Sequence, residues 1–289
     1  MKAFYFVTTE HLEEALWFRD DEDFAVGMNH VAIGAFHFKE LKIFVFILMS
    51  NHVHFLIYGE YEDVVRFINE FKGRYSHYYQ KKYGKEFLLR ENGLRIDMVS
   101  LDHEGFEWTA AYVMMNCVHA NICSHPSQYP WGSGGAVFQI TTPKATRLGE
   151  LTGRGLRKFL HSGEKTIPKD WLIRDQGFIL PQNYVDTKEV ERRFRHIGRF
   201  NYFLNNSAKV KKRLEENRNL PAFRDQTILA AVPDLIRSLF GKAQFSDLTL
   251  DEQTELIRQI RYRFSADVNQ AARVCGITYA EAGKLVDRV

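Results

Sequence analysis

The sequence predicts an α+β fold: a ferredoxin-like β-α-β-β-α-β domain on an antiparallel sheet, followed by a mainly helical C-terminal region. Short segments rich in aromatic and β-branched residues have the length and alternation of strands. Longer segments between them have apolar residues at helical spacing. The order of these segments is strand, helix, two strands, helix and strand, with one more helix after them. Since both crossover helices of this layout cover one sheet face, the other face is expected to be free to bind a substrate.

The individual elements follow from local patterns. The first strand is K-A-F-Y-F-V-T-T, and the two central strands are joined by a very tight connection at Ser50-Asn51. The segment L-R-I-D-M-V-S-L alternates as a half-buried strand should. The predicted strands cover residues 2–9, 41–49, 52–58 and 94–101, and the predicted helices cover 22–38, 61–83 and 105–123.

Two domains are expected, over 1–145 and 146–289, because prolines and the run G-S-G-G end the first pattern. Residues 250–289 predict three short helices. Their small residues and the turn glycine Gly276 fit a helix-turn-helix, whose second helix could enter a DNA major groove. Many helical hairpins share this spacing, so a hairpin without DNA-binding function stays open.

Composition narrows the class of protein. The chain has 289 residues, 45% of them hydrophobic, which is enough for a substantial core, and its net charge of +3 argues only weakly for nucleic acid. Three cysteines do not make a disulfide framework, so reduced thiols are expected. There is no signal-peptide pattern and no apolar run of 18 residues. We therefore expect a cytoplasmic protein with no membrane partner.

The most informative motif is His52-Val53-His54, which opens the run N-H-V-H-F-L-I-Y. In a strand, alternate side chains point to the same face, so the two imidazoles would lie side by side while Val53 points away. Two neighbouring imidazoles are half of a metal site. Such a pair can also arise by accident in a strand.

A second set of polar residues lies on the helix expected over 105–123. Tyr112 and Asn116 are four residues apart and share one helix face. Asn116 could supply an oxygen ligand to a metal held by His52 and His54, and this donor set suits Mn²⁺ or Mg²⁺. Tyr112 would then attack a metal-bound phosphate as a nucleophile. An ordinary core tyrosine remains the alternative, and Tyr75, Tyr78 and Tyr79 compete for the role of nucleophile.

The helix over 61–83 ends in the basic, aromatic stretch K-G-R-Y-S-H-Y-Y-Q-K-K-Y-G. Between residues 72 and 95 there are seven Lys and Arg residues against two glutamates. This mixture is typical of a surface that follows phosphates and stacks on the bases of a single strand. The residues expected to contact DNA are Lys72, Arg74, Tyr75, Lys81, Lys82 and Arg95.

Three segments resemble one enzyme family. F-I-L-M-S-N-H-V-H-F-L-I is similar to the L-M-x-N-H-x-H-x-L-I motif of single-tyrosine HUH transposases, with the best match in their REP-associated tyrosine transposase branch. A-Y-V-M-M-N-C-V-H-A-N-I-C-S-H-P-S-Q-Y-P-W-G-S resembles that branch's Y-I-x-x-N-P-V-x-A-x-x-x-x-x-P-x-x-Y-P-W-S-S stretch. F-K-G-R-Y-S-H-Y-Y matches the helix between the two motifs. The resemblance covers about residues 1–140.

This resemblance implies that His52, His54 and Asn116 bind the divalent metal and that Tyr112 is the nucleophile. The expected activity is nicking and strand transfer on single-stranded or hairpin DNA through a covalent 5′-phosphotyrosine. The resemblance also implies a nucleoid-associated protein of bacterial type. The chain departs from the family pattern at Cys117, where a proline usually follows the asparagine. The family's usual stretches after the first strand and before the last strand are also replaced.

Two other functions remain open. The protein could be a domesticated, non-catalytic DNA-binding or regulatory protein, or a metal-dependent phosphodiesterase that uses water. Few carboxylates occur near the histidines, which disfavours the phosphodiesterase. Either a monomer or a homodimer is compatible with the sequence.

Overall fold

The computed structural model describes residues 2–9, 17–50, 52–84, 94–120, 122–140, 143–207, 225–264, 266 and 268–286. The chain forms two compact units, one of residues 1–119 and 123–214 and the other of residues 120–122 and 215–289. This division lies later in the chain than the boundary expected near 145, because the segments after 145 pack on the first unit. No helix in the described ranges is both long and apolar enough to cross a membrane.

The first unit is built on a four-stranded antiparallel sheet with the strand order β2-β3-β1-β4, which confirms the predicted fold class. Tyr5 pairs with Ile57 and with Met98, so β1 lies between β3 and β4. The tight connection that was expected between the central strands joins β2 to β3. The strands are β1 (Lys2–Thr9), β2 (Lys42–Leu48), β3 (Val53–Glu60) and β4 (Leu94–Met98).

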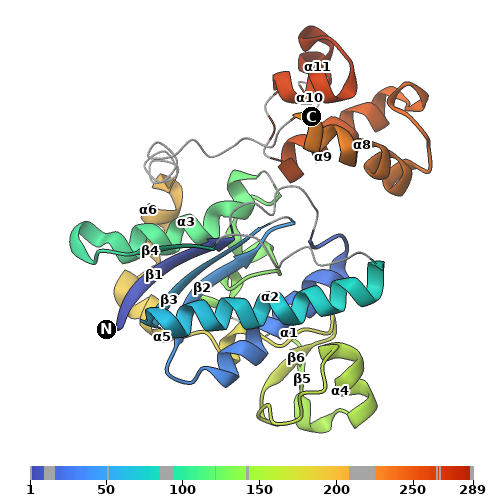
Figure 1. Ribbon diagram of the computed structural model, residues 1–289. Coiled ribbons are helices and arrows are strands. Elements are labelled where there is room, and N and C mark those ends of the chain that lie inside the picture. The colour runs from blue at the N-terminus through green and yellow to red at the C-terminus, as the bar shows by residue number, and fades with distance from the viewer. Residues whose placement is uncertain are drawn as a thin grey trace. The chain divides into compact units, whose positions relative to one another are not determined.

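Helices α1 (Asp21–His37) and α2 (Tyr61–Tyr83) lie together on one face of the sheet, as Figure 1 shows. Phe55 of β3 points to this face and packs against Phe67 and Phe71 of α2. Asp20 caps α1 by accepting a hydrogen bond from the Asp23 amide. Gly84 ends α2 in a left-handed conformation.

Helix α3 (Gly105–His119) covers part of the opposite face of the sheet (Figure 1). Phe106 of α3 packs against Phe4 and Phe44, with ring centroids 5.7 and 5.4 Å apart. The expectation that this face is free is therefore wrong. The expectation failed because it was drawn from the β-α-β-β-α-β order alone. Helix α3 follows this order in the chain and packs on the face that was expected to be free.

A smaller layer packs on α1 and contains a short two-stranded sheet that the sequence did not predict. Asn29, fully buried in α1, donates hydrogen bonds to the carbonyls of Phe159 and Gly177 and accepts one from the Ile179 amide. Leu148, Leu160 and other apolar side chains of this layer form a core with Ala32 and Ile33 of α1. The elements are β5 (Ala145–Arg147), α4 (Gly153–Leu160) and β6 (Leu172–Arg174).

Helices α5 (Thr187–Phe194) and α6 (Ile197–Asn206) complete the described part of the first unit. Arg199 of α6 forms ion pairs with Glu104 and Glu107, which ties α6 to the start of α3. The 3₁₀ turns are η1 (Asp102–Glu104), η2 (Pro126–Gln128), η3 (Gly134–Ala136), η4 (Leu148–Glu150), η5 (Pro181–Asn183) and, in the second unit, η6 (Phe245–Asp247).

The second unit is helical and has its own core, which includes Leu256, Ile260 and Ala271. Gly276, with a φ of 69°, makes the turn between its last two helices. The three short helices expected after residue 250 are present, whereas a helix-turn-helix function stays a prediction. The helices are α8 (Asp225–Phe240), α9 (Leu250–Phe264), α10 (Val268–Cys275) and α11 (Tyr279–Val286).

Candidate active site at the start of strand β3

The turn between β2 and β3 fixes the position of the two histidines. The Met49 amide donates a hydrogen bond to the His52 carbonyl at 2.8 Å. The Ser50 carbonyl accepts hydrogen bonds from the amides of Trp17 and Phe18, at 2.9 and 3.1 Å. The chain therefore enters β3 in a fixed register, with His52 just before the strand and His54 as its second residue.

The Y-P-W-G-S segment protects the outer edge of β2, the strand that leads into this turn. The Tyr129 hydroxyl donates to the Leu48 carbonyl at 2.7 Å, and the Leu48 amide donates to the Trp131 carbonyl at 2.8 Å. A Cβ at Gly132 would lie 2.7 Å from the Phe46 carbonyl oxygen. Only glycine allows this close approach of two backbones. The motif therefore supports the strand that leads into the site and does not line the site itself.

His52, His54 and Tyr112 come together on the sheet face that α3 covers. The ring centroids of His52 and His54 are 4.7 Å apart, and those of His54 and Tyr112 are 5.7 Å apart. Phe6 of β1 stacks on His54 and contacts the Tyr112 ring edge-on, at 5.5 and 5.8 Å. Sequence reasoning missed Phe6, although alternation along β1 places it on the same face as Phe4 and Thr8.

Asn116 lies one turn after Tyr112 on α3. Its Nδ2 donates to the Tyr112 carbonyl at 2.8 Å, and its side chain also hydrogen-bonds the His54 ring. Burial lowers the pKa of His54 well below its usual value of 6.5, and the neighbouring charges of His52 and Arg95 lower it further, against the opposing effect of Asn116. His54 is thus neutral at pH 7, which is the form of imidazole that binds metals.

The donor set fits a divalent metal. His54 Nδ1 is buried and has no hydrogen-bond partner in the described structure, so this nitrogen has unused ligand capacity. No group of three His, Cys, Asp or Glu residues in the described ranges is arranged to hold a metal. Two imidazoles and the amide oxygen of Asn116 are the residues that would hold one.

Arg95 brings a positive charge to the same sheet face. Thr8 of β1 pairs with His54 on one side and with Arg95 on the other, so the three residues form a row across three strands. The Arg95 guanidinium lies 5.8 Å from the centre of the Phe6 ring, and its Nε is 2.5 Å from an Asp97 oxygen. Arg95 thus lies on the same face as His54, where its guanidinium is ion-paired with Asp97.

The other expected DNA contacts all lie on α2, on the opposite face of the sheet. Tyr75 is 1% exposed, and its hydroxyl donates to the Trp17 carbonyl. Burial raises the pKa of Tyr75 well above its usual value. Tyr79 is 2% exposed. In this fold neither ring is available to stack on a base or to attack a phosphate at the histidine pair.

The cations of α2 differ in how open they are to solvent. Lys72 is 6% exposed, and burial lowers its pKa. Arg74 is ion-paired with Glu70. Lys82 forms ion pairs with three carboxylates at the start of α1, and these raise its pKa against the effect of burial. Of the four, only Lys81 is exposed, and it has no ion pair with a described residue.

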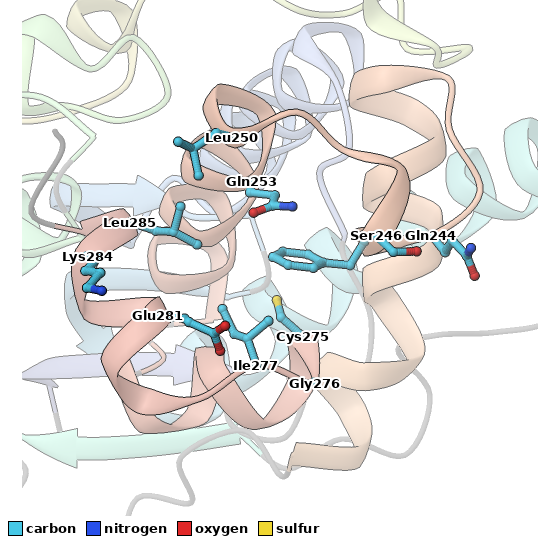
Figure 2. A pocket seen from close by; sticks show the side chains of 11 residues that line it. Gln244, Ser246, Leu250, Gln253, Cys275, Gly276, Ile277, Glu281, Lys284 and Leu285 are labelled. Atoms are coloured by element: carbon cyan, nitrogen blue, oxygen red, sulfur yellow. The ribbon is translucent and has the colours of Figure 1, made fainter.

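The second unit contains a hollow of about 740 Å³ next to the α10–α11 turn, which Figure 2 shows. Leu250, Ile277 and Leu285 contribute apolar walls. The one carboxylate in its lining, Glu281, accepts hydrogen bonds from the Thr278 amide and hydroxyl as a helix cap. The lining has no histidine and offers no donor set like that at His52 and His54.

Part of the chain matches the sequence model of a known family. Residues 19–93 match the sequence model of a family described as "Transposase IS200 like". This segment contains His52 and His54, whereas Tyr112 and Asn116 lie after it. No curated protein sequence matches the chain.

The chain is also similar to a solved structure described as "Structure of the REP associates tyrosine transposase bound to a REP hairpin". The two are 13% identical with a TM-score of 0.37, and the match covers 46% of this chain and 78% of the other. The match to this family model supports, over residues 19–93, the resemblance to single-tyrosine transposases that was read in part from the histidine motif.

Proposed function

We propose that this protein nicks and rejoins single-stranded DNA in a divalent metal-dependent reaction, with Tyr112 as the nucleophile. The observation that supports this most directly is the contact of the Tyr112 and His54 rings, with Asn116 hydrogen-bonded to the same imidazole. A nucleophile, two imidazoles and an amide oxygen thus share one small region. Single-stranded or hairpin DNA is the proposed substrate.

Each side chain has a defined role in this reaction. His52, His54 and Asn116 hold the metal, which when bound supplies positive charge to the non-bridging phosphate oxygens. Arg95 adds a second cation on the same face. Phe6 packs on both His54 and Tyr112, so it keeps the two rings in contact and excludes water from one side.

The chemical step is a transesterification in which atoms and charge balance. The Tyr112 oxygen forms a bond to phosphorus while the bond from phosphorus to the 3′ oxygen breaks. The tyrosine proton passes to solvent, and the departing 3′ oxygen takes up a proton to leave a 3′-hydroxyl. The 5′-phosphotyrosine keeps one phosphodiester bond, so the reverse attack by a 3′-hydroxyl rejoins the strand without an external energy source.

The rival assignments have less support. Tyr75 and Tyr79 are buried under the opposite face of the sheet. A water-using phosphodiesterase would need a general base, and the side chains described around the His54 ring, Phe6, His52, Tyr112 and Asn116, are not carboxylates. A non-catalytic DNA-binding protein would not need Asn116 beside His54.

The test is incubation of the protein with an end-labelled hairpin DNA carrying single-stranded flanks, with Mg²⁺ or Mn²⁺, followed by a denaturing gel. The wild type should give a metal-dependent band at the combined mass of protein and DNA, and His54→Ala should not. Cleaved DNA without that band would favour hydrolysis by water. A stable complex without any cleavage would favour the non-catalytic DNA-binding protein.

A further inference from the structure

Two thiols meet at the end of the helix that carries Tyr112 and Asn116. Cys117, the residue after Asn116 in α3, is fully buried, and Cys123, which follows the helix after a short turn, is half-buried. Their side chains hydrogen-bond one another, with the Cys117 thiol as donor to the Cys123 sulfur. The pair therefore lies directly next to a residue of the candidate metal site.

The segment after Cys123 fixes its position. The next two backbone amides both donate to the side-chain oxygen of Gln128, at 3.0 and 3.3 Å. The turn that contains Gln128, η2, packs against α3. Tyr129 follows it, and its hydroxyl donates to the Leu48 carbonyl at the end of β2. Cys123 is thus held against α3 by contacts that do not involve its own side chain.

The two thiols differ in how readily they react. The Cys117 sulfur lies 3.3 Å from the Met114 carbonyl, so its one hydrogen has two acceptors, this carbonyl and the Cys123 sulfur. The hydrogen bond from Cys117 lowers the pKa of Cys123 against the effect of burial. Since the thiolate is the reactive form and Cys123 is the more exposed of the two, a dissolved oxidant reacts first at Cys123.

The same segment carries two histidines but does not form a metal site. The run C-V-H-A-N-I-C-S-H has a histidine two residues after each cysteine, and cysteine and histidine are ligands of zinc. Within the described ranges, however, no three His, Cys, Asp or Glu side chains are arranged to hold a metal. His119 Nε2 lies 3.1 Å from the Ser207 hydroxyl, and His125 Nδ1 lies 2.8 Å from the Ser127 hydroxyl. The two sulfurs therefore face each other as a dithiol.

The third cysteine of the chain offers a comparison. Cys275 belongs to the second unit, whereas Cys117 and Cys123 both belong to the first. Burial raises the pKa of Cys275 to about 12, so this thiol stays protonated at neutral pH. Proximity and exposure thus distinguish Cys117 and Cys123 from the third cysteine.

We infer that Cys117 and Cys123 are a reversible redox modification site, and that their disulfide switches off the candidate active site. The switch rests on the proposed function, whereas formation of the disulfide does not. Disulfides of this kind, formed transiently, are the type found in reducing compartments. The oxidant is a hydroperoxide, and the reductant that restores the thiols is a dithiol.

The oxidation balances in two steps. The Cys123 sulfur attacks one oxygen of hydrogen peroxide, the bond between the oxygens breaks, and the other oxygen leaves as water with the thiol proton. The Cys117 sulfur then attacks the sulfenic sulfur of Cys123 and expels a second water. Two thiols and one hydrogen peroxide give one disulfide and two waters.

The disulfide changes the end of α3. The bond between the sulfurs is about 2.05 Å long, so the two atoms must move well inside hydrogen-bonding distance. Because η2 holds Cys123, the last turn of α3 has to take up much of this movement. Asn116 precedes Cys117, and its side chain hydrogen-bonds the Tyr112 carbonyl, at 2.8 Å, and the His54 ring. We therefore expect the disulfide to draw Asn116 away from His54 and to weaken metal binding.

Peptide mapping tests the modification site. The full-length protein is treated with hydrogen peroxide, denatured, alkylated, digested with trypsin and analysed by mass spectrometry. No Lys or Arg lies between residues 95 and 144, so one peptide contains both Cys117 and Cys123. It should be two hydrogens lighter than the reduced peptide and carry no alkyl group, and dithiothreitol should reverse the change. Cys275 should remain free to be alkylated.

Mn²⁺ binding tests the switch without DNA or cleavage. The signal of free Mn²⁺ in electron paramagnetic resonance gives the affinity of reduced and oxidised protein, after removal of oxidant and reductant. Oxidation should lower the affinity by about tenfold or more, the usual loss when the support of a metal ligand is disturbed. Cys123→Ser should keep its affinity after oxidation. Cys275→Ser is the matched control and should respond like the wild type.

Each other result overturns part of the inference. Free thiols, irreversible oxidation of Cys123 or a disulfide between two chains would overturn the modification site. A disulfide that leaves Mn²⁺ affinity unchanged would overturn the switch, as would an equal loss of affinity in oxidised Cys123→Ser. If the proposed function itself fails, the reduced protein will not bind Mn²⁺, while the peptide map still decides whether the disulfide forms.

Discussion

Replacing Asn29 with alanine tests how the layer that carries α4 is attached to the rest of the first unit. Asn29 is fully buried and makes three hydrogen bonds, at 2.9 Å to the Phe159 carbonyl, 2.8 Å to the Gly177 carbonyl and 2.8 Å from the Ile179 amide. At about 1 kcal/mol each, their loss predicts destabilisation of about 3 kcal/mol. The figure is a minimum, since alanine also leaves three buried backbone groups without partners.

Two measurements on Asn29→Ala follow from this reasoning. Urea denaturation followed by circular dichroism gives the free energy of unfolding, and hydrogen exchange reports the protection of the Ile179 amide. Asn206→Ala is the control, because Asn206 makes one hydrogen bond to the Tyr202 carbonyl within its own helix. It should cost less than about 0.5 kcal/mol. A loss below about 1 kcal/mol in Asn29→Ala, with the Ile179 amide still protected, would refute the attachment through Asn29.

Three further predictions concern other parts of the first unit. Tyr75→Phe removes the hydrogen bond to the Trp17 carbonyl and should lower the free energy of unfolding by about 1 kcal/mol in urea denaturation while the covalent DNA adduct still forms. Gly132→Ala places a Cβ 2.7 Å from the Phe46 carbonyl and should lower the melting temperature, by an overpacking cost of about 1–3 kcal/mol, and reduce cleavage. His30 is buried and its pKa is lowered from 6.5 to about 3, so only the unfolded state takes up its proton between these values. Stability should fall as the pH drops from 6.5 towards 3, approaching about 1.4 kcal/mol per pH unit, and His30→Gln should show a shallower fall in acid titrations.

The order of elements in the first domain could be predicted because each has a strong local period. The strands over 2–9 and 42–48 and the helix over 61–83 match their predicted spans within one or two residues. The layer of β5, α4 and β6 escaped prediction because its strands have only three residues each. Such segments are too short for alternation to be recognised, and their pairing depends on contacts with α1.

The candidate site was predictable in part for the same reason. His52 and His54 could be assigned to one face from strand alternation, and Tyr112 and Asn116 to one face from helical spacing. That these two faces meet is a tertiary contact that no local pattern contains. The α2 residues show a case in which the sequence pattern misleads. Tyr75 and Lys82 belong to a basic, aromatic stretch that is typical of DNA binding, but in the structure Tyr75 hydrogen-bonds the Trp17 carbonyl and Lys82 is ion-paired with Asp23. Composition alone cannot separate a DNA-binding face from a buried aromatic cluster.

The measurement that most directly tests the central claim is the identification of the residue that becomes attached to DNA. The wild-type protein would be incubated with hairpin DNA and Mn²⁺, digested with nuclease and protease, and analysed by mass spectrometry. Tyr112→Phe would be treated in the same way. A nucleotide on the peptide that contains Tyr112, and no adduct in Tyr112→Phe, is the predicted result. A nucleotide on Tyr75 or Tyr79, or an undiminished adduct in Tyr112→Phe, would contradict the account.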